Sequence, residues 1–150
     1  NSISTLKKVS LCDVSGRPLQ EIFTNIQFDI QIEFIVKVPG STVGITLIVY
    51  DGEGNCVFSS INNNDDHWYG KPMPVGSYMT ICKIPPNYFN NGWFSISINM
   101  FGKNYSEPKM ENDVLRFHIQ DSFEIRGDYH GEYCGCVRPC LGWSTQALNS

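Results

Sequence analysis

Apolar and polar residues alternate along most of the chain, as they do in strands that bury one face. A helix would scatter such residues around its circumference, so the alternation predicts strands with one buried and one hydrated face. It recurs near residues 3–11, 43–49, 56–61, 77–84, 93–101 and 114–120, and no segment of ten residues has helical periodicity. The clearest run places Ile26, Phe28, Ile30, Ile32, Phe34, Val36 and Val38 at every second position.

Turn residues separate these segments. The glycine-rich stretch 51–55 joins two apolar runs, so residues 43–61 are predicted to form a hairpin. Pro85-Pro86 ends one strand, and Asn90-Asn91-Gly92 leads into the next. The unequal linkers 62–76 and 102–113 favour Greek-key connections. We therefore expect an all-β, immunoglobulin-like antiparallel sandwich of about seven or eight strands.

Length and charge narrow the class of protein. The 150 residues fit one domain, since domains most often have roughly 100–150 residues. The net charge of −4 and the lack of a basic cluster argue against nucleic-acid binding. No apolar run of membrane-spanning length, start Met or signal peptide is present, so residues 1–150 are expected to be a soluble domain cut from a longer protein.

Motifs for catalysis, cofactors and metals are missing from the sequence. It contains no GxSxG, HExxH, P-loop or GxGxxG pattern, so we expect neither an enzyme nor a cofactor. The cluster Cys134, Cys136 and Cys140 has C-x-C-x₃-C spacing, which lacks the knuckle typical of structural zinc, so we expect no metal. The six cysteines are expected to be reduced thiols in a cytosolic setting, and the Arg126-Gly127-Asp128 tripeptide is taken as a coincidental match to the integrin motif.

The outward row of the strand at 93–101 is the best candidate for a binding surface. It sets small polar residues between two aromatic ones, which suits the apolar face and hydroxyl rim of a sugar ring. The strand at 114–120 and the loop at 62–76 add further polar and aromatic side chains, and the sequence leaves open which region holds the site. The candidates are Trp93, Ser95, Ser97, Asn99, Phe101, Arg116, His118, His67, Trp68 and Tyr69.

Several motifs together resemble those of one protein family. The chain contains Arg126-Gly127-Asp128-Tyr129, then Gly131, then Gly135-Cys136-Val137-Arg138-Pro139, and then Trp143. The hairpin 51–58 and the passages 76–78 and 84–93 follow the same family pattern. Their order and spacing, over residues 5–145, resemble the C-terminal domain of Wzt-type proteins, the ATP-binding subunits of O-antigen and polysaccharide ABC exporters. Two departures are the absence of Walker motifs and the presence of Cys136 and Cys140 where the family commonly has apolar residues.

The resemblance implies a function and a set of partners. It implies a domain that binds the non-reducing end of an O-antigen or related polysaccharide on the cytoplasmic face of the bacterial inner membrane, and so licenses export. The implied partners are the nucleotide-binding domain of the same polypeptide, a membrane permease and a second copy of the chain.

The implied homodimer exchanges a C-terminal strand. The polar stretch 121–132 would be the hinge and 133–141 the exchanged strand. Three alternatives stay open: a protein-binding immunoglobulin-like module, a carbohydrate esterase or lyase, and a dimerisation scaffold without a ligand. The residues expected in the exchanged segment are Arg126, Asp128, Tyr129, Val137, Arg138, Pro139 and Trp143.

Overall fold

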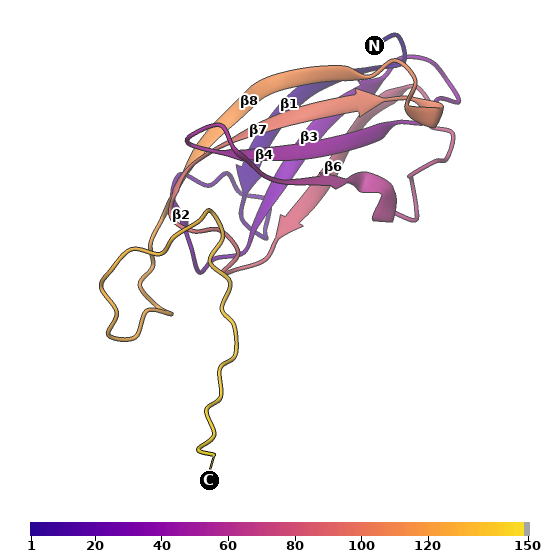
Figure 1. Cartoon of the computed structure of the whole chain (residues 1–150). Coiled ribbons are helices and arrows are strands. Elements are labelled where there is room, and N and C mark those ends of the chain that lie inside the picture. Colours follow the sequence, from indigo (N-terminus) through magenta and orange to yellow (C-terminus); the bar gives the residue numbers. More distant parts are fainter. Residues whose placement is uncertain (149–150) are drawn as a thin grey trace.

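Two β-sheets face each other in the computed structural model, which describes residues 1–148 (Figure 1). One sheet has the strand order β1-β3-β6, and the other has the order β2-β8-β7-β4-β5. The predicted antiparallel sandwich of seven or eight strands is confirmed. The strands are β1 (Ser4–Cys12), β2 (Ile22–Phe23), β3 (Phe28–Val36), β4 (Gly44–Asp51), β5 (Cys56–Ile61), β6 (Gly76–Ile84), β7 (Gly92–Phe101) and β8 (Lys109–Gln120).

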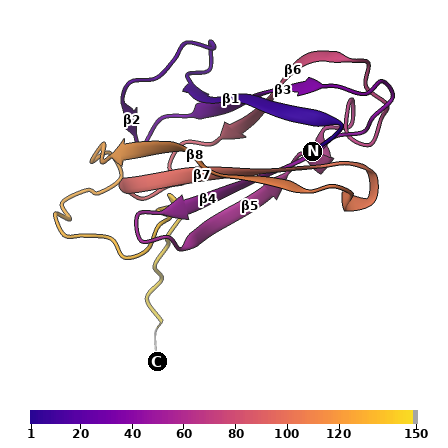
Figure 2. The same cartoon turned by 90° about the horizontal axis from the view of Figure 1, so that it is seen from above.

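The strand order is that of an immunoglobulin-like sandwich, in which the chain crosses repeatedly between two sheets. The crossings lie between β1 and β2, β2 and β3, β3 and β4, β5 and β6, and β6 and β7. The short strand β2 adds to one edge of the larger sheet and is parallel to β8, whereas the other pairs are antiparallel. Figure 2 shows the two layers that result, with β1, β3 and β6 in one and β4, β5, β7 and β8 in the other.

The core lies between the layers and follows the alternation of the sequence. In β3 the side chains of Phe28, Ile30 and Ile32 are each at most 2% exposed, because all three point toward the larger sheet. The inward row of β7 meets them, and its Phe94 ring packs against Phe89 of the β6–β7 connection, with ring centroids 4.7 Å apart and planes tilted by 56°. Each such side chain contributes roughly 1.5–3 kcal/mol to stability when fully buried. The core thereby fixes which faces of β7 and β8 point outward.

Helical structure in residues 1–148 is limited to two 3₁₀ turns, η1 (Asn62–Asn64) and η2 (Lys103–Tyr105). This agrees with the lack of helical periodicity in the sequence. A helix long and apolar enough to cross a membrane does not occur in this part of the chain.

The segment after β8 differs from the sequence-based expectation. Residues 133–141 do not form a regular strand, and their pairing consists of a single bridge between Val137 and Phe89. From about residue 139 the chain extends away from the sandwich (Figures 1 and 2). The side chains of residues 139–148 are exposed, and that of Trp143 is 93% exposed. The bridge is closed by two backbone hydrogen bonds, from the Asn90 N–H to the Cys136 carbonyl and from the Arg138 N–H to the Tyr88 carbonyl.

Candidate functional site

The outward row of β7 is only partly accessible. Trp93 is 60% exposed and Ser95 and Asn99 are half-buried, but Ser97 and Phe101 are each only 3% exposed. The expectation that all five residues face the solvent is therefore wrong for Ser97 and Phe101. Two local features that the alternation of the sequence does not encode explain these two burials.

A bulge in β8 covers Ser97. The pairing of β7 with β8 jumps from Ile96–Leu115 to Ile98–Glu111, so the three residues 112–114 of β8 lie opposite the single residue Ser97. The Asp113 N–H donates a hydrogen bond of 3.1 Å to the Ser97 hydroxyl. Bulges of this kind leave a residue out of the ladder and redirect the strand. The Ser97 hydroxyl therefore stabilises the bulge.

Phe101 is buried against a glycine on the neighbouring strand. A Cβ atom at Gly44 would overlap the Phe101 ring, so the absence of a side chain there lets the ring lie flat on β4. Tyr105 covers the other side of the ring, with ring centroids 4.7 Å apart. Phe101 thus closes the end of the sheet and offers little surface to a ligand.

The outward residues at the start of β7 and at the end of β8 are more accessible than Ser97 and Phe101. Trp93 lies directly opposite His118, with ring centroids 4.8 Å apart and planes tilted by 42°. Ser95 lies opposite Arg116 in the next pair. The structure therefore brings together four of the predicted binding residues, namely Trp93, Ser95, Arg116 and His118.

Trp93, Ser95 and Arg116 border a hollow of about 550 Å³ at one end of the large sheet. Its other walls come from the turn after β4, where Gly52 and Gly54 have no side chains to fill it. Trp93 and Arg116 also border a wider hollow of about 700 Å³ on the side where β1 and β8 face each other. The Trp93 ring is thus reachable from two sides, which suits an aromatic platform for stacking.

The charged groups around Trp93 are already paired. The Arg116 guanidinium contacts the Asp113 carboxylate at 3.1–3.2 Å, and this partner raises the pKa of Arg116. The Asp51 carboxylate accepts hydrogen bonds from the Glu53 and Asn55 N–H groups, and the bond from Asn55 contributes most to lowering the pKa of Asp51. The hollow therefore presents an Arg116–Asp113 ion pair together with the Asp51 carboxylate, which stays ionised.

The loop residues His67, Trp68 and Tyr69 do not line the hollows beside Trp93. Trp68 packs edge-on against Tyr78 of β6 at 5.5 Å, and His67 packs against Trp68. Tyr69 instead lines a hollow with Phe101 and Tyr105 at the end of the sandwich. The ten predicted residues therefore do not form one site.

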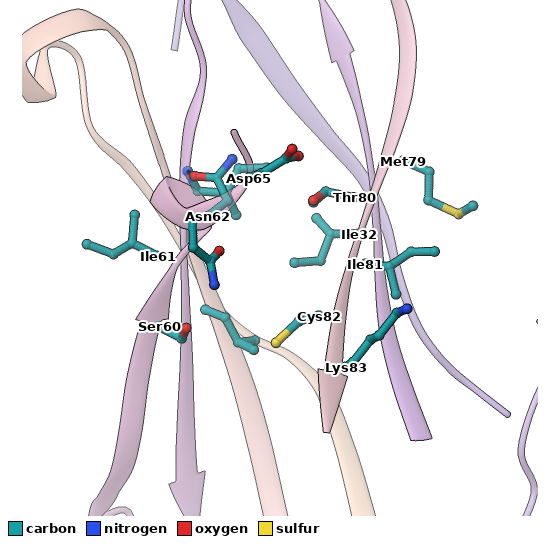
Figure 3. A pocket seen from close by; sticks show the side chains of 13 residues that line it. Ile32, Ser60, Ile61, Asn62, Asp65, Met79, Thr80, Ile81, Cys82 and Lys83 are labelled. Carbon is teal, nitrogen blue, oxygen red and sulfur yellow. Dashed lines mark hydrogen bonds between the residues drawn. The ribbon is translucent and has the colours of Figure 1, made fainter. Parts of the chain in front are cut away.

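A cleft between the two sheets is the feature that sequence reasoning missed. It opens where β5 and β6, the outer strands of their sheets, face each other, and its volume is about 510 Å³ (Figure 3). Thr80 and Cys82 point into it from β6, opposite Ile32 and Ile30 of the neighbouring strand β3. The sequence signal for this cleft was the presence of Thr80 and Cys82 in the inward row 78–84, because such small side chains do not fill the space between the sheets at that edge.

Two of the residues expected in an exchanged segment, Arg126 and Arg138, belong to a buried ion-pair network with Asp121. The Asp121 carboxylate accepts hydrogen bonds from Arg138 at 2.9 and 3.0 Å and from Arg126 at 2.7 Å. The bonds from Arg138 contribute most to holding the pKa of Asp121 far below its ordinary value of 3.8. Arg138 also donates to the Thr24 hydroxyl, so the network ties residues 121–138 to the sandwich.

The other predicted members of this segment lie at its surface. The Tyr133 ring, which the sequence did not single out, contacts both guanidinium groups, with centroid distances of 5.1 Å to Arg126 and 4.8 Å to Arg138. The amide of Asn90, also missed, donates to the carbonyl oxygens of Tyr133 and Gly135. Asp128, Tyr129, Val137, Pro139 and Trp143 are exposed.

Metal ligands do not gather in the described residues. No group of three or more His, Cys, Asp or Glu side chains in residues 1–148 is placed to hold an ion. All six cysteines are unbridged in the structure.

The fold, but not the sequence, matches known proteins. No protein-family model matches the sequence, and no curated protein matches it either. Among solved structures, the C-terminal domain of Wzt is similar over 97% of this chain and 86% of its own, with a TM-score of 0.76 and 9% sequence identity. The β-glucuronidases of Bacteroides uniformis and Parabacteroides merdae match less well, with 11% and 14% identity, TM-scores of 0.43 and 0.42, and coverage of 73% and 77% of this chain but only 12% and 14% of theirs. The resemblance expected from the motifs is thus confirmed in the fold.

Proposed function

We propose that this chain is a non-catalytic domain that binds the non-reducing end of a bacterial surface polysaccharide and so licenses its export by an ABC transporter. The fold shared with the C-terminal domain of Wzt supports the class of protein. The observation that carries the binding role is the exposed Trp93 ring beside His118, Ser95 and Arg116. An aromatic platform beside adaptable polar groups is what a sugar ring requires.

Weak binding suits such a gate. A few sugar contacts give millimolar to high-micromolar affinity, about 4–6 kcal/mol. Two sites in one transporter raise the effective ligand concentration without new contacts, and weak sites release the polymer once transport begins. The domain would act on the cytoplasmic side, joined to a nucleotide-binding domain and working with a membrane permease.

The test is calorimetric titration of the domain with a panel of purified bacterial O-polysaccharides that differ in their non-reducing ends. We expect saturable binding to one of them, and we expect Trp93→Ala to weaken it about tenfold, because roughly 1.4 kcal/mol of stacking is lost. Tyr105→Ala is the matched control, since Tyr105 is 63% exposed and lies at the other end of the sandwich.

Three results would contradict the proposal. The first is equal loss of binding in the Trp93 and Tyr105 variants, and the second is no binding to any polysaccharide. The third is release of acetate or shortened chains during incubation, which would indicate an enzyme.

A second candidate function is a dimerisation or protein-binding module without a glycan ligand. It is favoured by the C-terminal segment, in which Leu141, Trp143 and Leu148 are exposed. Exposed apolar residues on an extended segment are typical of a surface that binds protein. In our proposal this segment exchanges between two copies of the chain, and the glycan site is retained in each copy.

A further inference from the structure

The cleft between β5 and β6 has the size and lining of a small-ligand site. Its volume of about 510 Å³ lies within the range of roughly 300–1,000 Å³ that is common for such sites. Its floor is made by the core residues Ile32, Ile45 and Leu47, each 2–3% exposed. Polar groups from both sheets converge above this floor. A ligand with one apolar side and a polar rim would therefore find both kinds of partner.

The polar groups are positioned by the strands. Ser60 and Asn62 point into the cleft from the larger sheet, and Thr80 points into it from β6 (Figure 3). The Asn62 side-chain oxygen accepts the Ile45 N–H at 2.9 Å, which holds the amide in place and leaves its nitrogen to donate toward the cleft. Two hydroxyls and one fixed amide match the alternating donors and acceptors of a sugar rim.

The charge of the lining disfavours anionic ligands. The Asp65 carboxylate lies at the rim, with one oxygen accepting the His67 N–H at 3.2 Å. Lys83 borders the cleft, but its side chain points to the opposite side of β6, as Ile81 does (Figure 3). Burial, and then the charge of Asp29, raise the pKa of the Cys82 thiol, so this side chain is neutral as well. The groups that point inward are thus uncharged apart from one carboxylate.

An aromatic surface continues from the cleft. Trp68, which is 40% exposed, and Tyr78 line a narrow extension of about 50 Å³ that shares Asn62, Asp65 and Thr80 with the main cleft. Together with the apolar floor, these rings offer stacking to the C–H face of a bound ring. Trp68, which the sequence analysis grouped with Trp93, therefore lies beside this cleft and not beside the Trp93 surface.

We infer that the inter-sheet cleft is a second carbohydrate site, and that it takes an uncharged sugar residue bearing an apolar group such as the methyl of a 6-deoxyhexose. The apolar group would lie against Ile32 and Ile45, and the ring hydroxyls would bond Thr80 and Asn62. The inference rests on the proposed function for the class of ligand, but it concerns a site on a different side of the molecule.

The experiment is a titration followed by methyl NMR on the isotopically labelled chain. Methyl α-L-rhamnoside should shift the methyl signals of Ile32, Ile45 and Leu47 with millimolar affinity, whereas D-glucuronate should not. Thr80→Val keeps the side-chain shape and removes the hydroxyl, so it should weaken binding at least about threefold. Ser77→Ala is the control, because it removes a hydroxyl from the exposed opposite face of β6. Asp65→Asn should allow D-glucuronate to bind.

The outcomes separate this inference from the proposed function. Unmoved methyl signals, equal shifts with D-glucuronate, or equal effects of the Thr80 and Ser77 variants would overturn the second site. A cleft already filled by the C-terminal segment of another copy would also leave the methyls unmoved and overturn it. The indole N–H signal of Trp93 reports on the other surface in the same spectra, so a silent Trp93 with responsive cleft methyls would contradict only the site assigned under the proposed function.

Discussion

Ser97 and Trp93 occupy the same face of β7, yet their surroundings make them chemically different. Trp93 meets the solvent beside His118, whereas the bulge in β8 buries Ser97 and uses its hydroxyl as an acceptor. Alternation fixes the face to which a side chain points, but it does not fix what covers that face. The usable binding surface at residue scale is therefore shorter than the polar row in the sequence.

Gly44 gives a prediction at the same scale. Gly44→Ala would push a methyl group into the Phe101 ring, and because such overpacking forces shifts of backbone and ring, we expect a loss of about 1–3 kcal/mol. Urea unfolding followed by fluorescence measures this free energy. Gly142→Ala is the control, since a Cβ there would contact nothing within 4 Å. Equal stability of the Gly44 variant and the parent would show that the ring is not held as described.

At the scale of elements, the segment that follows β8 is fastened by charge and hydrogen bonds. Asp121 binds Arg126 and Arg138, and between these two arginines Asn90 binds the carbonyls of residues 133 and 135. The Arg138 N–H then donates to the Tyr88 carbonyl. The RGDY-like motif therefore has a structural role through Arg126, which anchors the loop.

Removing the central carboxylate should release this segment. Asp121→Asn loses a charge-assisted interaction with each arginine, so we expect hydrogen exchange at the Arg138 and Asn90 amides to accelerate at least about tenfold, equivalent to about 1.5–3 kcal/mol. Asp128→Asn, which changes an exposed carboxylate of the Arg126–Tyr129 motif, should leave hydrogen exchange unchanged. Equal acceleration in both variants would show that the network is not the anchor.

The same carboxylate sets the acid sensitivity of the segment. Because the pKa of Asp121 is lower in the folded chain than its ordinary value of 3.8, its stabilising contribution is present above that value and is lost as the pH falls below it. We expect protection of the Arg138 amide to persist at pH 5 and to decline only in stronger acid. A decline centred near neutral pH, measured by hydrogen exchange, would indicate that another group holds the segment.

At the scale of the whole molecule, one chain leaves its C-terminal segment uncovered. Residues 139–148 extend from the sandwich and expose Leu141, Trp143 and Leu148. The strand expected at 133–141 is held to its own sandwich as far as Arg138, so in our proposal the segment that pairs with a second copy begins after this residue. The anchor at Arg138 would set the point from which the segment leaves.

Deleting residues 139–150 should therefore convert a dimer into a monomer. We expect light scattering to give twice the chain mass for the parent and the single chain mass for the truncated chain. The truncation leaves the eight strands and the Asp121–Arg138 contacts intact, so the Trp93 surface should still bind polysaccharide. A dimer that survives the truncation would contradict strand exchange.

The sequence by itself determined the sandwich, because period-two alternation specifies the buried face of each strand and the Gly, Pro and Asn turns specify where strands end. It also identified Trp93, Ser95, Arg116 and His118, which are adjacent because 93–101 and 114–120 pair. Only the tertiary structure decided that the β8 bulge buries Ser97, that Trp68 belongs to a separate cleft, and that Asp121 joins Arg126 to Arg138. These features depend on strand register and on contacts between distant segments, and no local pattern in the sequence carries that information.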